Sequence, residues 1–208
     1  MDVEMAYGEW SLQYDTNLNK TRDLEAIALK ETLGHYHFEH CLELGCGTGK
    51  NTGWLAQICH KVTALDLTKE MIEIAKSKIN SANTKFIIAD INNEWDFENN
   101  EFDLATFSLV LEHIQDLDPI FEKLSKVIVK GGHVYIGELH PFKQYAGSKA
   151  RFVTEHGEQV VNCYHHHLSD FFAAANKSGF LIEHMNEYFD DNDRANIPRI
   201  LTILCKKI

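Results

Sequence analysis

The apolar residues of the chain alternate between short runs typical of buried β-strands and longer stretches with helical spacing. This pattern predicts strands at residues 40–44, 61–66, 84–89, 102–108 and 132–139. It also predicts helices near residues 50–58, 69–80 and 117–128. Strands that alternate with helices in this way indicate a parallel sheet that is covered by helices.

The C-terminal part of the chain has a different pattern. A helical stretch near residues 168–178 is followed by two strand-like runs, 180–188 and 199–206. The polar run between these two strands is too short to hold a crossover helix, so they should pair antiparallel. We therefore expect an α/β fold, with a seven-stranded, mostly parallel, doubly wound sheet and a C-terminal antiparallel strand. We also expect a single domain over residues 1–208.

Composition and charge narrow the class of protein. The 208 residues include 20 Lys and Arg against 31 Asp and Glu, which gives a net charge of −11 and makes a nucleic-acid partner improbable. No apolar run is long enough for a membrane span, and the acidic N-terminus lacks the pattern of a secretion signal. We therefore expect a cytoplasmic protein without a membrane partner, whereas the choice between monomer and homodimer stays open.

A glycine-rich loop is the strongest local signal in the sequence. Residues 43–49 read ELGCGTG, follow a predicted strand and open a predicted helix. A dinucleotide-binding motif would need glycine at the position of Lys50, and a phosphate-binding P-loop would need Ser or Thr at the position of Asn51. Both motifs are excluded on spacing. The remaining pattern, three alternate glycines after an acid, suits a ligand without a pyrophosphate.

Acidic residues follow the next two predicted strands. Asp66 ends the second strand, where its carboxylate can accept hydrogen bonds from both hydroxyls of a ribose. Asp90 and Ile91 end the third strand, where an acid beside an apolar side chain suits the edge and one face of an adenine. Asp90 taken alone is equally compatible with a turn or helix cap. Acids at successive strand ends beside the glycine loop nevertheless predict a nucleoside site.

With these motifs, the sequence resembles class I S-adenosylmethionine-dependent methyltransferases over nearly its whole length. The segments that carry the resemblance are ELGCGTG at 43–49, ALDL at 64–67, IADI at 88–91, the region 102–113 and VKGG at 129–132. The chain is most similar to the small-molecule enzymes of this class, which include quinone C-methyltransferases. The resemblance implies the class I methyltransferase fold and S-adenosylmethionine as cofactor, and it says little about the acceptor.

The resemblance also implies a set of cofactor-binding residues. Residues 1–35 are expected to cover the cofactor, with Arg22 either paired with its carboxylate or solvated on a surface helix. His113 is expected near the cofactor or packed beneath it. The complete expected set is Tyr14, Arg22, Gly45, Cys46, Gly47, Gly49, Asp66, Leu67, Met71, Asp90, Ile91, Ser108, Leu109 and His113.

The acceptor is expected beside the segment 140–167, which is long for a plain connection. We expect His140 and Tyr145 to be catalytic residues, and Lys149 and Arg151 to favour an anionic acceptor. A polar loop that only covers the pocket is an equal alternative. No metal site is expected, because adjacent histidines such as those at 165–167 rarely point at one ion.

The sequence thus predicts an enzyme that methylates a small molecule at an oxygen, nitrogen or carbon atom. A non-catalytic S-adenosylmethionine-binding subunit of a larger methyltransferase assembly is the alternative. The acceptor, the methylated atom and the use of a catalytic base stay open.

Overall fold

The computed structural model describes residues 3–154 and 157–208. Its main sheet has the strand order β3-β2-β1-β4-β5-β9-β8, and a separate hairpin pairs β6 with β7. The strands of the main sheet are β1 (Phe38–Leu44), β2 (Cys59–Asp66), β3 (Thr84–Ile88), β4 (Phe102–Ser108), β5 (Ile128–Leu139), β8 (Phe180–Tyr188) and β9 (Ile200–Lys207). The hairpin strands are β6 (Arg151–Thr154) and β7 (Gly157–Val160).

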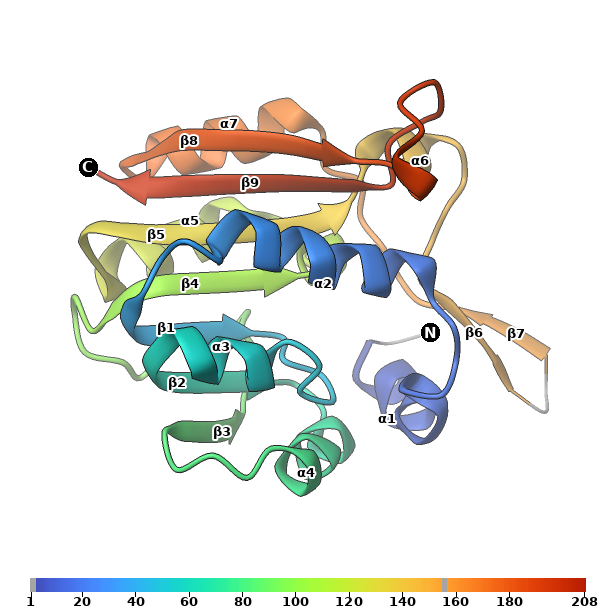
Figure 1. Ribbon diagram of the computed structural model, residues 1–208, viewed down its shortest axis with the longest axis horizontal. Helices are drawn as coiled ribbons and strands as arrows, with labels where there is room; N and C mark the ends of the chain where they lie inside the picture. The colour runs from blue at the N-terminus through green and yellow to red at the C-terminus, as the bar shows by residue number, and fades with distance from the viewer. Residues whose placement is uncertain (1–2, 155–156) are drawn as a thin grey trace.

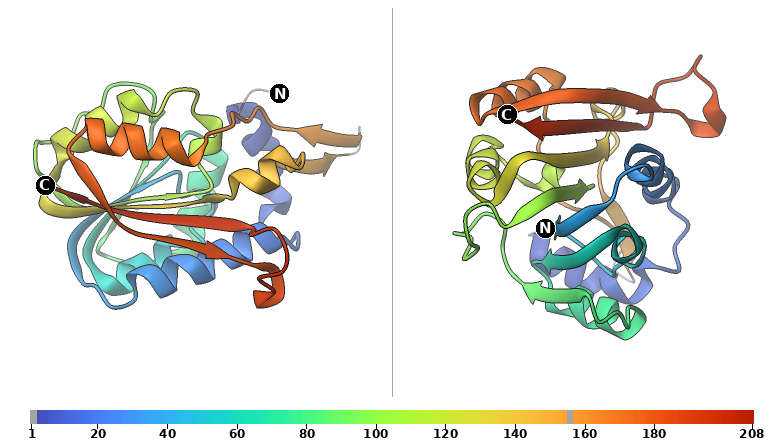
Figure 2. Two further views of the ribbon diagram at one scale, coloured as in Figure 1. Left: turned by 90° about the horizontal axis from the view of Figure 1, so that it is seen from above. Right: turned by 60° about the vertical axis from the view of Figure 1, so that its left-hand side comes forward.

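Helices lie on both faces of the main sheet, with α2 and α3 on one side and α5 and α7 on the other (Figures 1 and 2). The α-helices are α1 (Val3–Tyr14), α2 (Lys20–Leu33), α3 (Thr52–Ile58), α4 (Lys69–Lys78), α5 (Asp118–Val127), α6 (Pro141–Tyr145) and α7 (Leu168–Lys177). Two short 3₁₀ turns are η1 (Leu111–His113) and η2 (Asp190–Asn192). Among the helices of the described ranges, none combines the length and apolar character that a membrane crossing needs.

The predicted fold class is confirmed. Strands β1 to β5 pair in parallel, whereas β9 runs antiparallel to both β5 and β8. The strand predictions were close, and the largest difference is at β5, which begins at Ile128 rather than at residue 132. Ile128 occupies a helical position in the apolar pattern, but its backbone already belongs to the strand and pairs with Phe102.

The core is formed on both faces of the sheet. Phe107, Phe121 and Phe180 are almost fully buried in the cluster beneath α5 and α7. Leu29 and Tyr135 are fully buried in the cluster on the opposite side, beneath α2 and α3. Because the central strands are buried on both faces, their sequences are nearly continuous apolar runs rather than alternating ones.

A second layer of structure lies beyond the carboxyl ends of the parallel strands. Helix α1 and the β6–β7 hairpin meet there and are together called the cover (Figure 1). The rings of Trp10 and Phe152 are stacked with their centroids 5.1 Å apart, and Ala6 and Val161 complete this small apolar cluster. The segment 140–167 is therefore not one long loop, because it contains α6 and the hairpin; residues 155 and 156 lie outside the described part.

Candidate active site

The glycine loop joins β1 to α3 at the centre of the strand ends. Gly45, Gly47 and Gly49 all have positive φ, at 77°, 53° and 80°. A Cβ atom on Gly45 would overlap with the Val110 side chain, whereas a Cβ on Gly47 would meet nothing within 4 Å. The loop therefore needs glycine for its shape, and it leaves the backbone at Gly47 open to a ligand.

Asp66 is fixed beside this loop by two backbone amides. The Gly47 amide donates to Asp66 Oδ2 and the Thr68 amide donates to Asp66 Oδ1, each at 2.8 Å. Burial raises the pKa of Asp66, and the two amide bonds oppose that shift. Each carboxylate oxygen keeps a lone pair for a further donor, so Asp66 is oriented to accept hydroxyl groups.

A cavity, here called the central cavity, opens in front of Asp66. It brings together ten of the residues that the sequence associates with the cofactor: Tyr14, Gly45, Gly47, Asp66, Leu67, Asp90, Ile91, Ser108, Leu109 and His113. Asp90 also has the local role that the sequence allowed, since its Oδ1 accepts the Asn92 amide at 2.8 Å. The other residues that line the central cavity are Val3, Tyr7, Thr68, Ala89, Asn92, Val110 and Ile114.

A smaller, more polar recess, here called the polar pocket, continues from the central cavity beneath the glycine loop. It is lined by Arg22, Glu25, Glu43, Cys46 and Asn51, among others, and it shares Tyr14, Gly45, Gly47, Ser108 and Leu109 with the central cavity. Two of its buried polar atoms, Arg22 Nε and Asn51 Oδ1, have no hydrogen-bond partner within residues 3–154 and 157–208. The pocket thus presents one open donor and one open acceptor.

The Arg22 side chain is held in place by the N-terminal segment. Its guanidinium lies 3.9 Å from the centroid of the Tyr14 ring and donates to the carbonyl oxygens of Tyr14 and Asn17. Asn19 caps α2 by accepting the Thr21 and Arg22 amides. Arg22 is 8% exposed, so it is not the solvated surface residue of the alternative interpretation.

Two buried carboxyl groups face the same pocket. Glu25 accepts hydrogen bonds from Asn51 Nδ2 at 3.0 Å and from the Tyr135 hydroxyl at 3.1 Å, and Glu43 accepts one from Thr52 Oγ1 at 2.6 Å. Burial raises the pKa of Glu25 to about 7 and that of Glu43 to about 8. The sequence analysis did not assign Glu25, although an acid three positions after Arg22 on one helix face was a usable signal.

Tyr7 and His113 form a hydrogen-bonded pair at the mouth of the central cavity. His113 Nδ1 lies 2.9 Å from the Asn162 carbonyl oxygen, which can only accept, so Nδ1 carries the proton. In the neutral form of this tautomer, Nε2 accepts the Tyr7 hydroxyl proton at 2.9 Å. Burial raises the pKa of Tyr7 well above its ordinary value, so this phenol stays protonated. Tyr7 was not assigned from the sequence.

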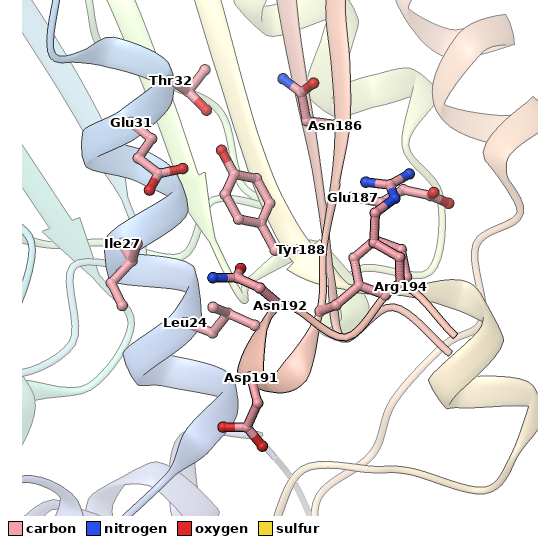
Figure 3. Close-up of a pocket in the computed structure, with 11 residues that line it drawn as sticks. Leu24, Ile27, Glu31, Thr32, Asn186, Glu187, Tyr188, Asp191, Asn192 and Arg194 are labelled. Atoms are coloured by element: carbon pink, nitrogen blue, oxygen red, sulfur yellow. The ribbon is translucent and has the colours of Figure 1, made fainter. Parts of the chain in front are cut away.

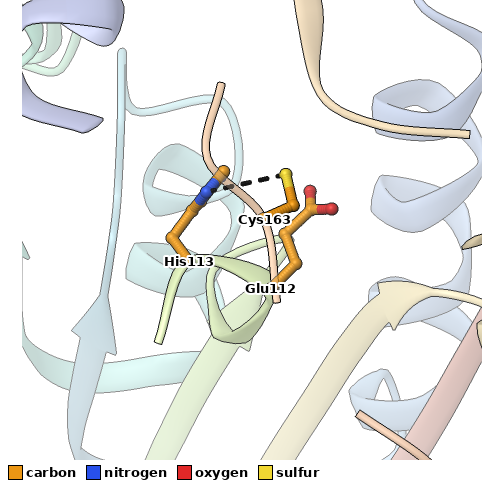
Figure 4. Close-up of side chains that lie close together, drawn as sticks. All are labelled: Glu112, His113 and Cys163. Carbon is orange, nitrogen blue, oxygen red and sulfur yellow. Dashed lines mark hydrogen bonds between the residues drawn. The ribbon is translucent and has the colours of Figure 1, made fainter. Parts of the chain in front are cut away.

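His113 also belongs to a cluster with Glu112 and Cys163 (Figure 4). Their potential ligand atoms lie within 4.8 Å of one another, and Cys163 Sγ is 4.0 Å from His113 Nδ1. Burial raises the pKa of Cys163 to about 12, which keeps the thiol protonated, and His113 Nδ1 is already occupied by a carbonyl. The cluster is therefore a hydrogen-bonded group rather than a prepared metal site.

Several other expected residues have different surroundings. Met71 is fully buried in α4 and does not line the central cavity, because its helix position faces the core. Gly49 packs against α4, where a Cβ would lie 3.3 Å from Ala75 Cβ. Cys46 lines the polar pocket.

His140 and Tyr145 do not line the described cavities at the strand ends. His140 is fully buried; its Nδ1 accepts the Phe142 amide at the start of α6, and its Nε2 donates to Glu187 at 3.1 Å. The Tyr145 hydroxyl is 2.5 Å from His167 Nδ1 on the exposed surface. The expectation that His140 reaches an acceptor is corrected by this geometry, because both ring nitrogens are used to fix the turn after β5.

A third cavity, here called the basic cavity, lies between the cover and the start of α2. It shares Tyr7, Tyr14 and Leu109 with the central cavity, so the two spaces adjoin. Its remaining lining residues are Trp10, Asn19, Thr21, Arg22, Glu112, Leu139, Ser148, Lys149, Ala150, Arg151 and Arg199.

A separate hollow, the outer pocket, lies between α2 and the turn that joins β8 to β9 (Figure 3). It shares no lining residue with the three spaces at the strand ends. Its labelled side chains include the acids Glu31, Glu187 and Asp191 and the cation Arg194. The outer pocket is therefore not continuous with the glycine loop.

Comparison with known proteins identifies the class. Residues 42–136 match a family model described as a methyltransferase domain. The chain is 27% identical to an uncharacterized methyltransferase of Emericella nidulans, over 87% of this chain and 76% of that protein. It is 32% identical to a ubiquinone biosynthesis O-methyltransferase of Vibrio atlanticus, over 68% of this chain and 62% of that protein.

The fold also has a solved counterpart. A solved S-adenosylmethionine-dependent methyltransferase of Mesorhizobium loti superposes with a TM-score of 0.74 and 21% identity, over 89% of this chain and 100% of that one. The fold of this chain is therefore that of class I methyltransferases. The predicted resemblance to methyltransferases is thus confirmed over residues 42–136, and the predicted fold over most of the chain.

Proposed function

We propose that this enzyme transfers a methyl group from S-adenosylmethionine in the central cavity to a small organic acceptor in the basic cavity. One observation carries the proposal: the two cavities meet at Tyr7, Tyr14 and Leu109. A donor and an acceptor that occupy adjoining cavities can be aligned without leaving the protein, and such positioning is worth up to about 7–11 kcal/mol.

The residues present fit the cofactor. Asp66 would accept the ribose hydroxyls, while Asp90 and Ile91 would contact the adenine. In the polar pocket, the open donor Arg22 Nε and the open acceptor Asn51 Oδ1 match the carboxylate and the ammonium of an amino acid. A zwitterionic end group therefore meets groups of opposite hydrogen-bonding character, neither of which has a partner in the described part of the chain.

Bound there, S-adenosylmethionine would supply a sulfonium methyl group, whose carbon–sulfur bond breaks as the bond to the acceptor forms. The protein's own part is to orient the acceptor and to exclude water. Tyr7, Trp10 and Tyr14 are three aromatic residues of α1, and Trp10 is 5% exposed. This helix covers the region where the two cavities meet.

An acceptor hydroxyl must also lose its proton. Tyr7 lines both cavities, and its hydroxyl lies 2.9 Å from His113 Nε2, to which it donates when the imidazole is neutral. The Tyr7 hydroxyl can therefore accept the acceptor's proton while passing its own proton to His113. The relative that is an O-methyltransferase supports an oxygen acceptor of this kind.

The experiment is turnover by the purified chain. The protein is incubated with labelled S-adenosylmethionine and fractionated metabolite extracts, and S-adenosylhomocysteine and labelled product are both quantified. We expect equal amounts of the two, and Asp66→Ala as the matched control should reduce both. Tight cofactor binding without either product in any fraction would favour a non-catalytic subunit and contradict the proposal.

A further inference from the structure

The basic cavity has a charge balance opposite to that of the whole protein. Among its described lining residues, Arg22, Lys149, Arg151 and Arg199 are cationic, and Glu112 is the acid. The chain as a whole has 20 basic and 31 acidic side chains. A random sample of this surface would therefore be acidic, and the concentration of cations in one cavity points to an anionic ligand.

Two of these cations are held rigidly. Arg199 donates through Nε and Nη2 to the two oxygens of Asp190, at 2.5 and 2.6 Å, and through Nη1 to Thr21 Oγ1 at 3.0 Å. Arg22 is fixed by its stacking on Tyr14. Asp190 neutralises part of the Arg199 charge from outside the cavity lining, so Arg199 contributes less than a full positive charge to the cavity.

Lys149 lies just before β6 and Arg151 is its first residue, and both are exposed. Both line the basic cavity, so its exposed part carries two cationic side chains. Burial raises the pKa of Glu112, so the acid that faces them carries its charge less readily than an exposed carboxyl. The Asn19-capped start of α2 also borders the cavity and adds the positive end of a helix dipole.

The inner end of the cavity has a different character. Trp10, Tyr7, Leu109 and Leu139 supply aromatic and apolar surface, and Tyr7 and Leu109 also line the central cavity. The cavity volume is about 250 Å³, which is below the range of about 300–1,000 Å³ typical of sites for drug-sized ligands. The shape suits a small molecule with an apolar body and one charged end.

We propose that the methyl acceptor is a small organic anion. Its carboxylate or phosphate group lies against Lys149 and Arg151, its body contacts Trp10, and its methylated atom points past Tyr7 and Leu109. The identification of this anion as the methyl acceptor rests on the proposed function. The first test measures binding alone and needs no turnover.

The binding test uses matched pairs of probes. Benzoate is compared with benzamide, and phenyl phosphate with phenol, by calorimetric titration of the full chain saturated with S-adenosylhomocysteine. We expect each anion to bind about tenfold or more tightly than its neutral partner, the gain expected of charge-assisted hydrogen bonds. The stronger of the two anions tells whether carboxylate or phosphate is preferred. Equal affinity of anion and neutral partner in both pairs would overturn the proposal.

The variant Lys149→Gln/Arg151→Gln should abolish that preference while the affinity for S-adenosylhomocysteine stays unchanged. The matched control is Lys61→Gln/Lys76→Gln, which alters the net charge equally at exposed positions away from the cavity. If the control loses the preference to the same degree, the preference comes from the net charge of the protein rather than from the basic cavity, and the proposal fails. If the cavity variant instead loses cofactor affinity, the two cations serve the methyl donor and the proposal fails.

Turnover separates this inference from the proposed function. Selective binding of anions by a chain that forms no S-adenosylhomocysteine with any acceptor would contradict methyl transfer and leave an anion site. Efficient methylation of neutral acceptors alone would support the proposed function and overturn the anionic acceptor. With a genuine anionic acceptor, the cavity variant should raise KM about tenfold or more with little change in kcat.

Discussion

The two halves of the site are built in different ways. The central cavity is formed by strand ends and by backbone groups, such as the Gly47 amide that holds Asp66. The basic cavity is formed largely by α1, the start of α2 and the residues around the start of β6, which are held together mainly by side chains, such as the stacked rings of Trp10 and Phe152 and the guanidinium of Arg22. The first half has its geometry fixed by the sheet, whereas the second half depends on a helix and a hairpin that can vary without disturbing the sheet.

The largest expected effect comes from removing one hydroxyl group of the cover, which tests the role of the basic cavity. Tyr7→Phe should lower kcat about a hundredfold or more if the acceptor is a hydroxyl, because the proton path to His113 is lost. Cofactor affinity should change little, since the ring remains. The rate is measured with saturating S-adenosylmethionine and the best acceptor found.

Tyr145→Phe is the matched control for that change. It removes a hydroxyl that contacts His167 on the exposed surface, and it should leave turnover near the wild-type value. The opposite outcome, with loss at Tyr145 and none at Tyr7, would restore the role that the sequence suggested for Tyr145.

The role of the central cavity is tested by a substitution at Asp66. Asp66→Ala should weaken S-adenosylhomocysteine binding by about 1.5–3 kcal/mol, the value of hydrogen bonds to a charged acceptor. The protein should remain folded by circular dichroism. Asp90→Ala should have a smaller effect, because Asp90 would accept a single adenine amino group, whereas Asp66 would accept two ribose hydroxyls. A larger loss of affinity for Asp90→Ala than for Asp66→Ala would show that Asp90 contributes more than Asp66 to cofactor binding.

The smallest expected effect concerns the buried carboxyl Glu43. Its folded-state pKa is raised to about 8 by burial, so the folded protein binds a proton that the unfolded chain has released between about pH 4.5 and 8. The stability contribution of this group therefore falls as the pH rises through that window. Glu43→Gln removes the titration, and its stability relative to wild type should increase from pH 5 to pH 8.

Denaturant unfolding at several pH values measures that difference. Glu73→Gln is a suitable control, since Glu73 is exposed on α4. A pH-independent difference between wild type and Glu43→Gln would show that Glu43 stays ionised in the folded protein.

The contrast between the halves also explains what the sequence could predict. The strands and most cofactor residues follow from local patterns, because a glycine loop and an acid at a strand end have their roles set within a few residues. Met71 is buried away from the lining of the central cavity, and the motif position alone does not say which face of α4 meets the core.

The acceptor side required long-range contacts that no local pattern encodes. Tyr7 reaches His113 across 106 positions in the chain, and Arg199 reaches Thr21 across 178. His140 was chosen for its position after β5, but its side chain turns back to cap α6. The sequence analysis associated Lys149 and Arg151 with an anionic acceptor because both follow the same strand end. Their positive charge is evident from the sequence without knowledge of their contacts.

The aromatic face of α1 has a kinetic consequence. Tyr7 and Tyr14 line both the central and the basic cavity. One rigid displacement of α1 would therefore open both cavities to solvent at the same time. Movement of α1 would then control both the binding of the two substrates and the release of the two products, which would leave together. In steady-state measurements, the two product dissociation rates should respond in parallel when the stacking of Trp10 on Phe152 is weakened.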